Sequence, residues 1–237
     1  LTAFPRSISA HFSRKLNEVI KTELDETPDC SIAGNSYTKI LKQLSKSDAV
    51  LIGPGLSLNS ETANFLFDVI INSPKPLVID ADALTLLAGN IEILKQRKSE
   101  NEIIITPHIG EFSRLSGKST EDINSNRFEI VRNFAKEYNV NVVLKSETTL
   151  SCTIDGKIYI NNTGNELLGS AGSGDVLSGI IVSLLAQTGN VNTAMICGNY
   201  VHGMLADIYF DKHDNKQSAS QQDLIKLIPA AVTELLG

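Results

Sequence analysis

The stretch GSAGSGDVLSGI, residues 169–180, places glycine and serine directly before an apolar run with a helical pattern. Glycine lets backbone N–H groups approach an anion closely, and a helix N-terminus adds unpaired donors and a favourable dipole. Gly172, Ser173 and Gly174 are therefore a candidate anion hole for a phosphate. The carboxylate of Asp175, which follows at once, either stabilises the helix dipole or acts as general base when a hydroxyl takes up a phosphoryl group. The local sequence leaves both roles open.

Residues that often bind ligands follow four short apolar runs of the chain. They are GPGLS (53–57), Asp80 with Asp82, PHIGE (107–111) with His108, and Glu147-Thr148-Thr149. Each of these features alone has a simpler explanation: the Gly-Pro-Gly segment could be only a turn, Asp80 and Asp82 could cap helices, and His108 could be a packed or surface histidine. In an open parallel sheet, however, ligands bind beyond the carboxyl ends of the strands, so four such ends indicate one site. Neither a P-loop nor a G-x-G-x-x-G after a first strand is present.

The elements that must position these residues alternate between short β-rich runs and longer helical patterns. Strands are predicted at 48–53, 76–81, 102–106 and 141–146. Helices are predicted at 60–71, with Ser60 as a possible cap, and at 119–138, 172–187, 192–210 and 221–236. A hairpin is predicted about Asp155-Gly156. Because the strands are apolar throughout, we expect an α/β fold with helices on both faces of a mostly parallel sheet.

The composition limits the class of partner. The 237 residues fit a single domain over 1–237, and a formal charge of −6 argues against binding to nucleic acid. No apolar run is long enough for a membrane span, and the first residues do not have the pattern of a signal peptide. Three cysteines lie far apart, which predicts buried free thiols in a reducing compartment. We therefore expect a cytoplasmic protein.

Five segments, in this order and spacing, closely resemble the NAD(P)H-hydrate dehydratase family. They are GPGLS, DADAL (80–84), TPHIGE (106–111), LKSETT (144–149) and NTGNELLGSAGSGDVLSGII (162–181). The resemblance implies a ribokinase-like three-layer α/β/α sandwich and a lyase that repairs hydrated NADH or NADPH. Such an enzyme uses ADP or ATP, normally with Mg²⁺, to phosphorylate the hydrate hydroxyl before phosphate is eliminated. ADP is expected here, although the sequence does not separate the two donors.

The resemblance also implies site residues. The hydrated dinucleotide is assigned to Gly55, His108 and Asp175, with Asp175 as catalytic base. The adenine nucleotide is assigned to Lys145, Ser146, Glu147, Thr148, Thr149 and Gly174. Asn162 and Asn165 are candidates to orient substrate or metal-bound water, although asparagines in such loops are more often turn formers. No protein ligand to a metal is assigned. A homo-oligomer and an epimerase companion are expected partners.

The chain departs from the family pattern at three places. Glu166-Leu167-Leu168 replaces the usual Pro-Gly-Met, which leaves the path of that loop open, and Ile109 replaces a proline. Family members also begin with strands that precede the segment LTAFP, so we expect those N-terminal strands to be missing from this chain. Two alternatives remain: a ribokinase-like kinase of hydroxyethylthiazole or hydroxymethylpyrimidine type, and a non-catalytic nucleotide-binding homologue.

Overall fold

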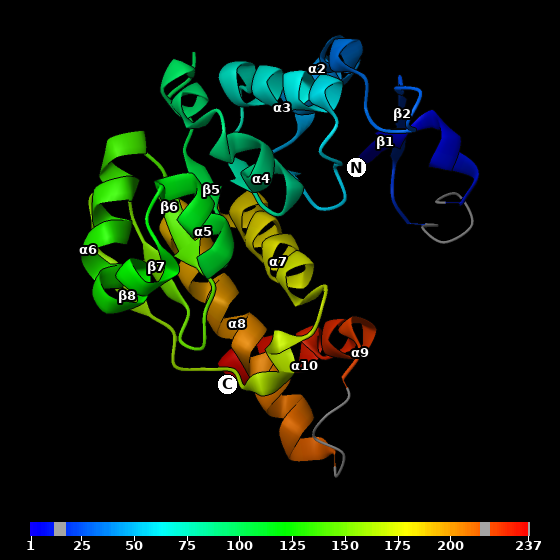
Figure 1. Ribbon diagram of the computed structural model, residues 1–237. Coiled ribbons are helices and arrows are strands. Elements are labelled where there is room, and N and C mark those ends of the chain that lie inside the picture. The colour runs from blue at the N-terminus through cyan, green and yellow to red at the C-terminus, as the bar shows by residue number, and fades with distance from the viewer. Residues whose placement is uncertain (12–17, 214–218, 237) are drawn as a thin grey trace.

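The computed structural model describes residues 1–11, 18–213 and 219–236, and its central element is a six-stranded sheet (Figure 1). The strands follow one another in chain order: β3 (Val50–Ile52), β4 (Leu77–Ile79), β5 (Ile103–Ile105), β6 (Asn141–Leu144), β7 (Leu150–Cys152) and β8 (Ile158–Ile160). The first four are parallel, and β7 and β8 continue the sheet in antiparallel pairs. The predicted strands, the mostly parallel sheet and the hairpin at Asp155-Gly156 are confirmed.

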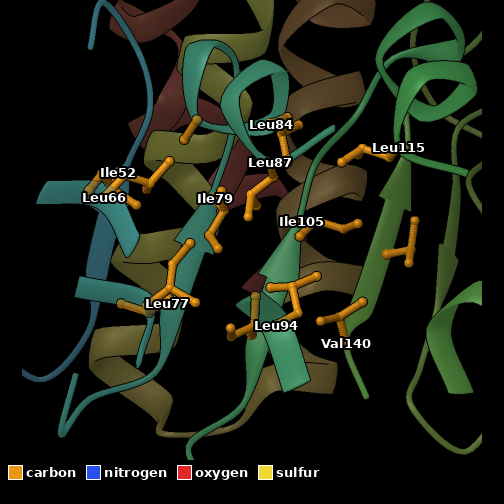
Figure 2. Close-up of a cluster of buried hydrophobic side chains, with 14 of the residues drawn as sticks. Ile52, Leu66, Leu77, Ile79, Leu84, Leu87, Leu94, Ile105, Leu115 and Val140 are labelled. Atoms are coloured by element: carbon orange, nitrogen blue, oxygen red, sulfur yellow. The ribbon is translucent and has the colours of Figure 1, made fainter. Parts of the chain in front are cut away.

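Helices cover both faces of this sheet because successive strand side chains point in opposite directions. Leu77 and Ile79 of β4 belong to one apolar cluster, whereas Val78 between them belongs to another. The first cluster, which Figure 2 shows in close-up, is covered by α3 (Ser60–Asn72), α4 (Asp82–Ala88), α5 (Ile109–Ser116) and α6 (Thr120–Tyr138). The second is covered by α7 (Ser173–Thr188) and α8 (Val191–Lys212). The result is a three-layer α/β/α sandwich.

Besides the main sheet and the helices named above, the chain has a small N-terminal sheet, further helices and short 3₁₀ turns. Near the N-terminus, β1 (Thr2–Pro5) and β2 (Lys21–Leu24) form a separate parallel pair, followed by α2 (Tyr37–Lys46). Four 3₁₀ turns complete the described secondary structure: η1 (Arg6–Ile8), η2 (Gly34–Ser36), η3 (Ile91–Gln96) and η4 (Glu166–Gly169). In the part of the chain described, no helix is both long and apolar enough to cross a bilayer.

Three details differ from the expectations. The helix predicted at 221–236 is two helices, α9 (Gln221–Lys226) and α10 (Ile228–Leu236), because Pro229 cannot donate the backbone hydrogen bond that would continue α9. The cap of α3 is Asn59 rather than Ser60, since its side-chain oxygen accepts the Glu61 N–H at 2.8 Å. Of the three free cysteines, only one is buried: Cys152 lies inside, and Cys30 and Cys197 are exposed.

Candidate active site

The carboxyl ends of the parallel strands lie next to one another and carry most of the predicted site residues. The Asp80 N–H donates to the Ile52 carbonyl at 3.1 Å, which joins the ends of β4 and β3. The Lys145 N–H donates to the Pro107 carbonyl at 2.8 Å, so His108 and Lys145 form an isolated bridge beyond β5 and β6. Residues far apart in the sequence thus meet at one edge of the sheet, as the strand pattern predicts.

A buried ion pair lies at the centre of this edge. Lys145 Nζ is 2.9 Å from Asp80 Oδ1, and the Asp80 side chain is 1% exposed. The other carboxylate oxygen, Asp80 Oδ2, is buried without a hydrogen-bond partner among the described residues. A Cβ added to Gly174 would lie 3.0 Å from Lys145 Nζ and 4.0 Å from Asp80 Oδ2. The ion pair therefore lies against the first turn of α7, where a side chain at position 174 would crowd the Lys145 ammonium.

That first turn of α7 presents unpaired backbone donors. Gly172 is the N-cap with φ +87°, a left-handed conformation that favours glycine. The Ser173 N–H donates to the Ser170 carbonyl at 3.2 Å, so it is not a free donor. Within the described residues, the backbone N–H groups of Gly172, Gly174 and Asp175 have no hydrogen-bond partner. These three donors, beside the Lys145 ammonium, are suited to the oxygens of a phosphoryl group.

The Asp175 side chain is exposed and, with Gly172, lines a groove of about 700 Å³ that runs along α7 towards α9 and α10. Burial and the neighbouring carboxylates of Asp80 and Asp82 raise the pKa of Asp175, while Lys145 opposes the shift. A carboxylate with a raised pKa holds a proton more tightly than ordinary Asp, as a general base should. The side chain is thus open to a ligand and close to the ion pair.

His108 caps α5 at the end of β5. Its Nδ1 accepts the N–H groups of Gly110 at 3.0 Å and Glu111 at 3.2 Å, and the Glu111 carboxylate accepts the His108 N–H at 2.8 Å. Because Nδ1 is an acceptor, the ring proton is on Nε2. Nε2 lies 3.6 Å from the Glu111 carboxylate, beyond hydrogen-bond distance, and the side chain is 55% exposed, so this N–H can reach a ligand carbonyl or phosphate.

The turn after β3 carries Gly55, which is exposed and has no atom within 4 Å of an added Cβ. Asp82 holds this turn, since its carboxylate accepts the Ser57 N–H at 2.8 Å. The sequence placed Asp80 and Asp82 at one of the four strand ends of the predicted site, with helix capping as the simpler alternative, and assigned neither residue a role in binding.

The predicted nucleotide residues 146–149 form a turn between β6 and β7 that is closed by its own hydrogen bonds. The Ser146 hydroxyl donates to the Thr148 carbonyl at 2.7 Å, and the Thr149 hydroxyl donates to the Ser146 carbonyl at 3.4 Å. Glu147 at its tip is exposed. The Asn161 N–H donates to the Thr149 carbonyl at 2.9 Å, which brings this turn beside the loop 161–165.

Asn162 in that loop is exposed, whereas both groups of the Asn165 amide are engaged. Asn165 Oδ1 accepts the Leu167 N–H at 3.1 Å, and its Nδ2 donates to Asp207 Oδ1 on α8 at 2.9 Å. The residues 166–168, which replace the usual Pro-Gly-Met of the family, lie in the 3₁₀ turn η4. In this turn Glu166 is exposed and Leu167 packs into the apolar cluster with α7 and α8. The unusual residues thus keep a compact turn before the glycine-rich segment.

A buried histidine that the sequence did not single out lies behind the glycine-rich turn. His202 Nε2 on α8 is 3.1 Å from the Ser173 hydroxyl, and both residues are buried. Burial lowers the pKa of His202 to about 4, an effect that a hydrogen bond with the Ser173 backbone opposes and that Lys145 increases. The ring is therefore neutral at ordinary pH.

The lowered pKa of His202 predicts a loss of stability in mild acid. In the unfolded chain this histidine binds a proton below about pH 6.5, whereas in the folded protein it does so only below about pH 4. The free energy of unfolding therefore decreases as the pH is lowered from about 6.5 to about 4. We expect this group to contribute about 3 kcal/mol to the loss. Urea denaturation between pH 7 and pH 4 measures it, with His202→Gln as the control that lacks the titration. Equal pH dependence in the two proteins would contradict the prediction.

The sheet order, the two helical layers and the glycine-rich turn before α7 match the ribokinase-like fold. The chain belongs to the NAD(P)H-hydrate dehydratase family, whose model matches residues 4–230. It is 34% identical over 230 residues to a Thermofilum pendens protein named bifunctional NAD(P)H-hydrate repair enzyme. The aligned residues make up 97% of this chain and 43% of the relative. The chain therefore spans less than half the length of that relative.

Two further comparisons agree. A Neisseria meningitidis protein named ADP-dependent (S)-NAD(P)H-hydrate dehydratase is 38% identical over 162 residues, which are 68% of this chain and 55% of the relative. The fold matches the solved structure of the ADP/ATP-dependent NAD(P)H-hydrate dehydratase from Bacillus subtilis co-crystallised with ATP and Mg²⁺. That match has a TM-score of 0.78 at 24% identity, and it covers 97% of this chain and 76% of the other.

Proposed function

We propose that this chain dehydrates hydrated NADH and NADPH at the expense of ADP or ATP, with Asp175 as the catalytic base. The single observation that carries the proposal is the position of Asp175: its exposed carboxyl group opens on the groove directly beside unpaired N–H groups of the first turn of α7. The family membership supports the dehydratase reaction, and the name of the Neisseria relative supports ADP as the donor.

In the proposed reaction, the Asp175 carboxylate removes the proton of the hydrate hydroxyl as its oxygen attacks the terminal phosphoryl group. The bond between that phosphorus and the nucleotide oxygen breaks, and AMP or ADP leaves. The amides of Gly172 and Gly174 and the ammonium of Lys145 stabilise the charge on the phosphoryl oxygens. The C–O bond to the new phosphate then breaks as a proton leaves the adjacent ring carbon, which restores the double bond. Phosphorylation converts a poor leaving group, hydroxide, into a good one.

The other predicted residues are proposed to bind. His108, with a donor at Nε2, and Gly55, with open space around it, would contact the hydrated dinucleotide. The turn 146–149 would lie along the adenine nucleotide, and Ile109, in place of the usual proline, leaves the capping of α5 by His108 intact. Asn162, which is exposed, remains a candidate to orient substrate.

A magnesium ion fits this site only as a companion of the nucleotide. Within the described residues, no group of three or more His, Cys, Asp or Glu side chains is arranged to hold a metal. The unpartnered Asp80 Oδ2 offers one carboxylate oxygen, and Mg²⁺ commonly takes one or two carboxylates together with substrate phosphates and water. Bound in this way, the ion would neutralise phosphate charge. The homo-oligomer, the epimerase companion and the cytoplasmic location remain predictions.

The test is to mix the chain with hydrated NADH and either ADP or ATP, and to follow the absorbance of the dihydronicotinamide. We expect the absorbance to return, with one phosphate and one AMP or ADP released per NADH restored. A kinase of the hydroxyethylthiazole type would instead accumulate a stable phosphorylated alcohol, and a non-catalytic homologue would bind nucleotide without turnover. Either of these outcomes would overturn the proposal.

A further inference from the structure

The glycine-rich turn at the start of α7 is held in place by side chains from other helices. The Gln221 amide at the start of α9 donates to the Ser170 hydroxyl at 2.8 Å and to the Ala171 carbonyl at 3.1 Å. One step further along, Ser173 meets His202 of α8 at 3.1 Å. A segment with so many glycines has little conformational preference of its own, so external contacts such as these must fix the direction of its N–H groups.

The Ser173–His202 hydrogen bond is placed to do this. Ser173 is 3% exposed and His202 is 7% exposed, so water competes little for either group. Ser173 lies between Gly172 and Gly174, whose amides are two of the unpaired donors, and a displacement of its side chain would move both. The residues are 29 positions apart, so the contact exists only because α7 packs on α8.

The same stretch of α8 also holds the loop 161–165 on the other side of the site. The Thr163 hydroxyl donates to the Tyr200 carbonyl at 2.9 Å, and Asp207 Oδ2 accepts the Gly164 N–H at 2.8 Å. Gly203, next to His202, packs so closely on this loop that an added Cβ would lie 2.1 Å from Thr163 Oγ1. One helix therefore fixes the glycine-rich turn and the loop 161–165 relative to each other.

On the basis of the proposed function, we propose that His202 is a positioning residue. Through its hydrogen bond with the Ser173 hydroxyl it holds the first turn of α7, so that the Gly172, Gly174 and Asp175 groups face the transferred phosphoryl group. Its neutral ring suits this role, because a charged ring would add a second cation behind the site near Lys145. Neither His202 nor the Ser173 side chain needs to touch the substrate.

The experiment is a double-mutant cycle on kcat and KM with Ser173→Ala, His202→Leu and the combined variant, together with His202→Gln. Because a misplacement of about 1 Å in a catalytic group can cost up to about 100-fold, we expect each single change to lower kcat by roughly 10- to 100-fold. We expect KM for the hydrated dinucleotide to change less than about threefold, since the N–H groups of the turn are proposed to face the nucleotide phosphates rather than the dinucleotide. The double variant should be no slower than the slower single variant, because both changes remove the same contact.

His202→Gln introduces a side-chain amide that can form a hydrogen bond with the Ser173 hydroxyl. Its kcat should therefore be close to that of the unmodified chain and above that of His202→Leu. Asn199→Leu is the matched control: it removes another buried α8 hydrogen bond, from Asn199 Nδ2 to the Ser151 hydroxyl at 2.6 Å, which does not reach the glycine-rich turn. We expect it to lower stability with kcat unchanged. Additive effects at 173 and 202, or an equal loss of kcat in Asn199→Leu, would overturn the inference.

The outcome separates this inference from the proposed function. If the unmodified chain restores no NADH, the proposed function fails. The coupling between positions 173 and 202 is then calculated from the ADP dissociation constants of the same variants, measured by calorimetry. Coupling between positions 173 and 202 in that constant would still support the positioning role. Additivity in it would reject the role independently of turnover.

Discussion

Replacement of Asp175 by asparagine is expected to lower kcat for NADH restoration about 1,000-fold, within the usual range for loss of a general base. Asparagine has nearly the same size and keeps a hydrogen-bonding oxygen, but it cannot accept the hydroxyl proton. The dissociation constant for ADP should change less than about threefold, because the backbone N–H groups of the turn and Lys145 remain in place. Absorbance kinetics and calorimetry measure the two quantities.

The pH dependence gives a second readout of the same change. Since burial and the Asp80 carboxylate raise the pKa of Asp175, activity of the unmodified chain should increase with pH through that raised pKa, as the carboxyl group loses its proton. The variant should lack this limb of the profile. Glu166→Gln is the control, because it removes an equal charge from an exposed neighbouring turn and should leave kcat unchanged. An equal loss of kcat and of nucleotide affinity in Asp175→Asn would assign the residue to structure instead.

Replacement of Gly53 by alanine is expected to lower the free energy of unfolding by about 4 kcal/mol, from overpacking and backbone strain together. Gly53 directly follows β3 and has φ +133°, and an added Cβ would lie 1.7 Å from the Asp80 carbonyl oxygen and 3.1 Å from the Ala83 Cβ. The neighbouring strand end would have to move. Because Asp80 carries the ion pair with Lys145, the change should also weaken nucleotide binding in the protein that still folds.

Gly55→Ala is the matched control for this prediction. Gly55 has φ +64°, but nothing lies within 4 Å of an added Cβ, so only the backbone strain of about 1 kcal/mol applies. Urea denaturation of the two variants separates the effects of contact and conformation. Similar losses of stability in both would mean that the close approach of β3 to Asp80 has been overestimated.

Much of the fold could be predicted because its signals are local. Apolar runs bounded by Gly, Pro and Asp marked four strands to within two residues at each end, and Asp155-Gly156 marked the hairpin. The break between α9 and α10 was missed, although Pro229 is a local signal, because the apolar pattern continues through it. The short helix α5 was also missed, since its cap is a histidine rather than one of the usual capping residues.

The site could be predicted in part for the same reason. Consecutive residues placed Asp175 one step from the glycine-rich turn, and motif spacing placed His108 and Lys145 at strand ends. The partners of these residues could not be predicted. Asp80 is 65 positions from Lys145, and the sequence placed the two residues at separate strand ends without pairing them.

The sequence by itself determined which residues are flexible, apolar or ionisable, and which of them lie within one turn or one strand of each other. This was enough for the α/β class, the strand ends and the junction of glycine turn, carboxylate and helix. Only the tertiary structure decided that Asp80 is buried beside Lys145, that His202 supports Ser173, and that the pKa of Asp175 is raised. The physical reason is that burial and electrostatic coupling depend on how separate layers pack, which brings together groups that no local spacing relates.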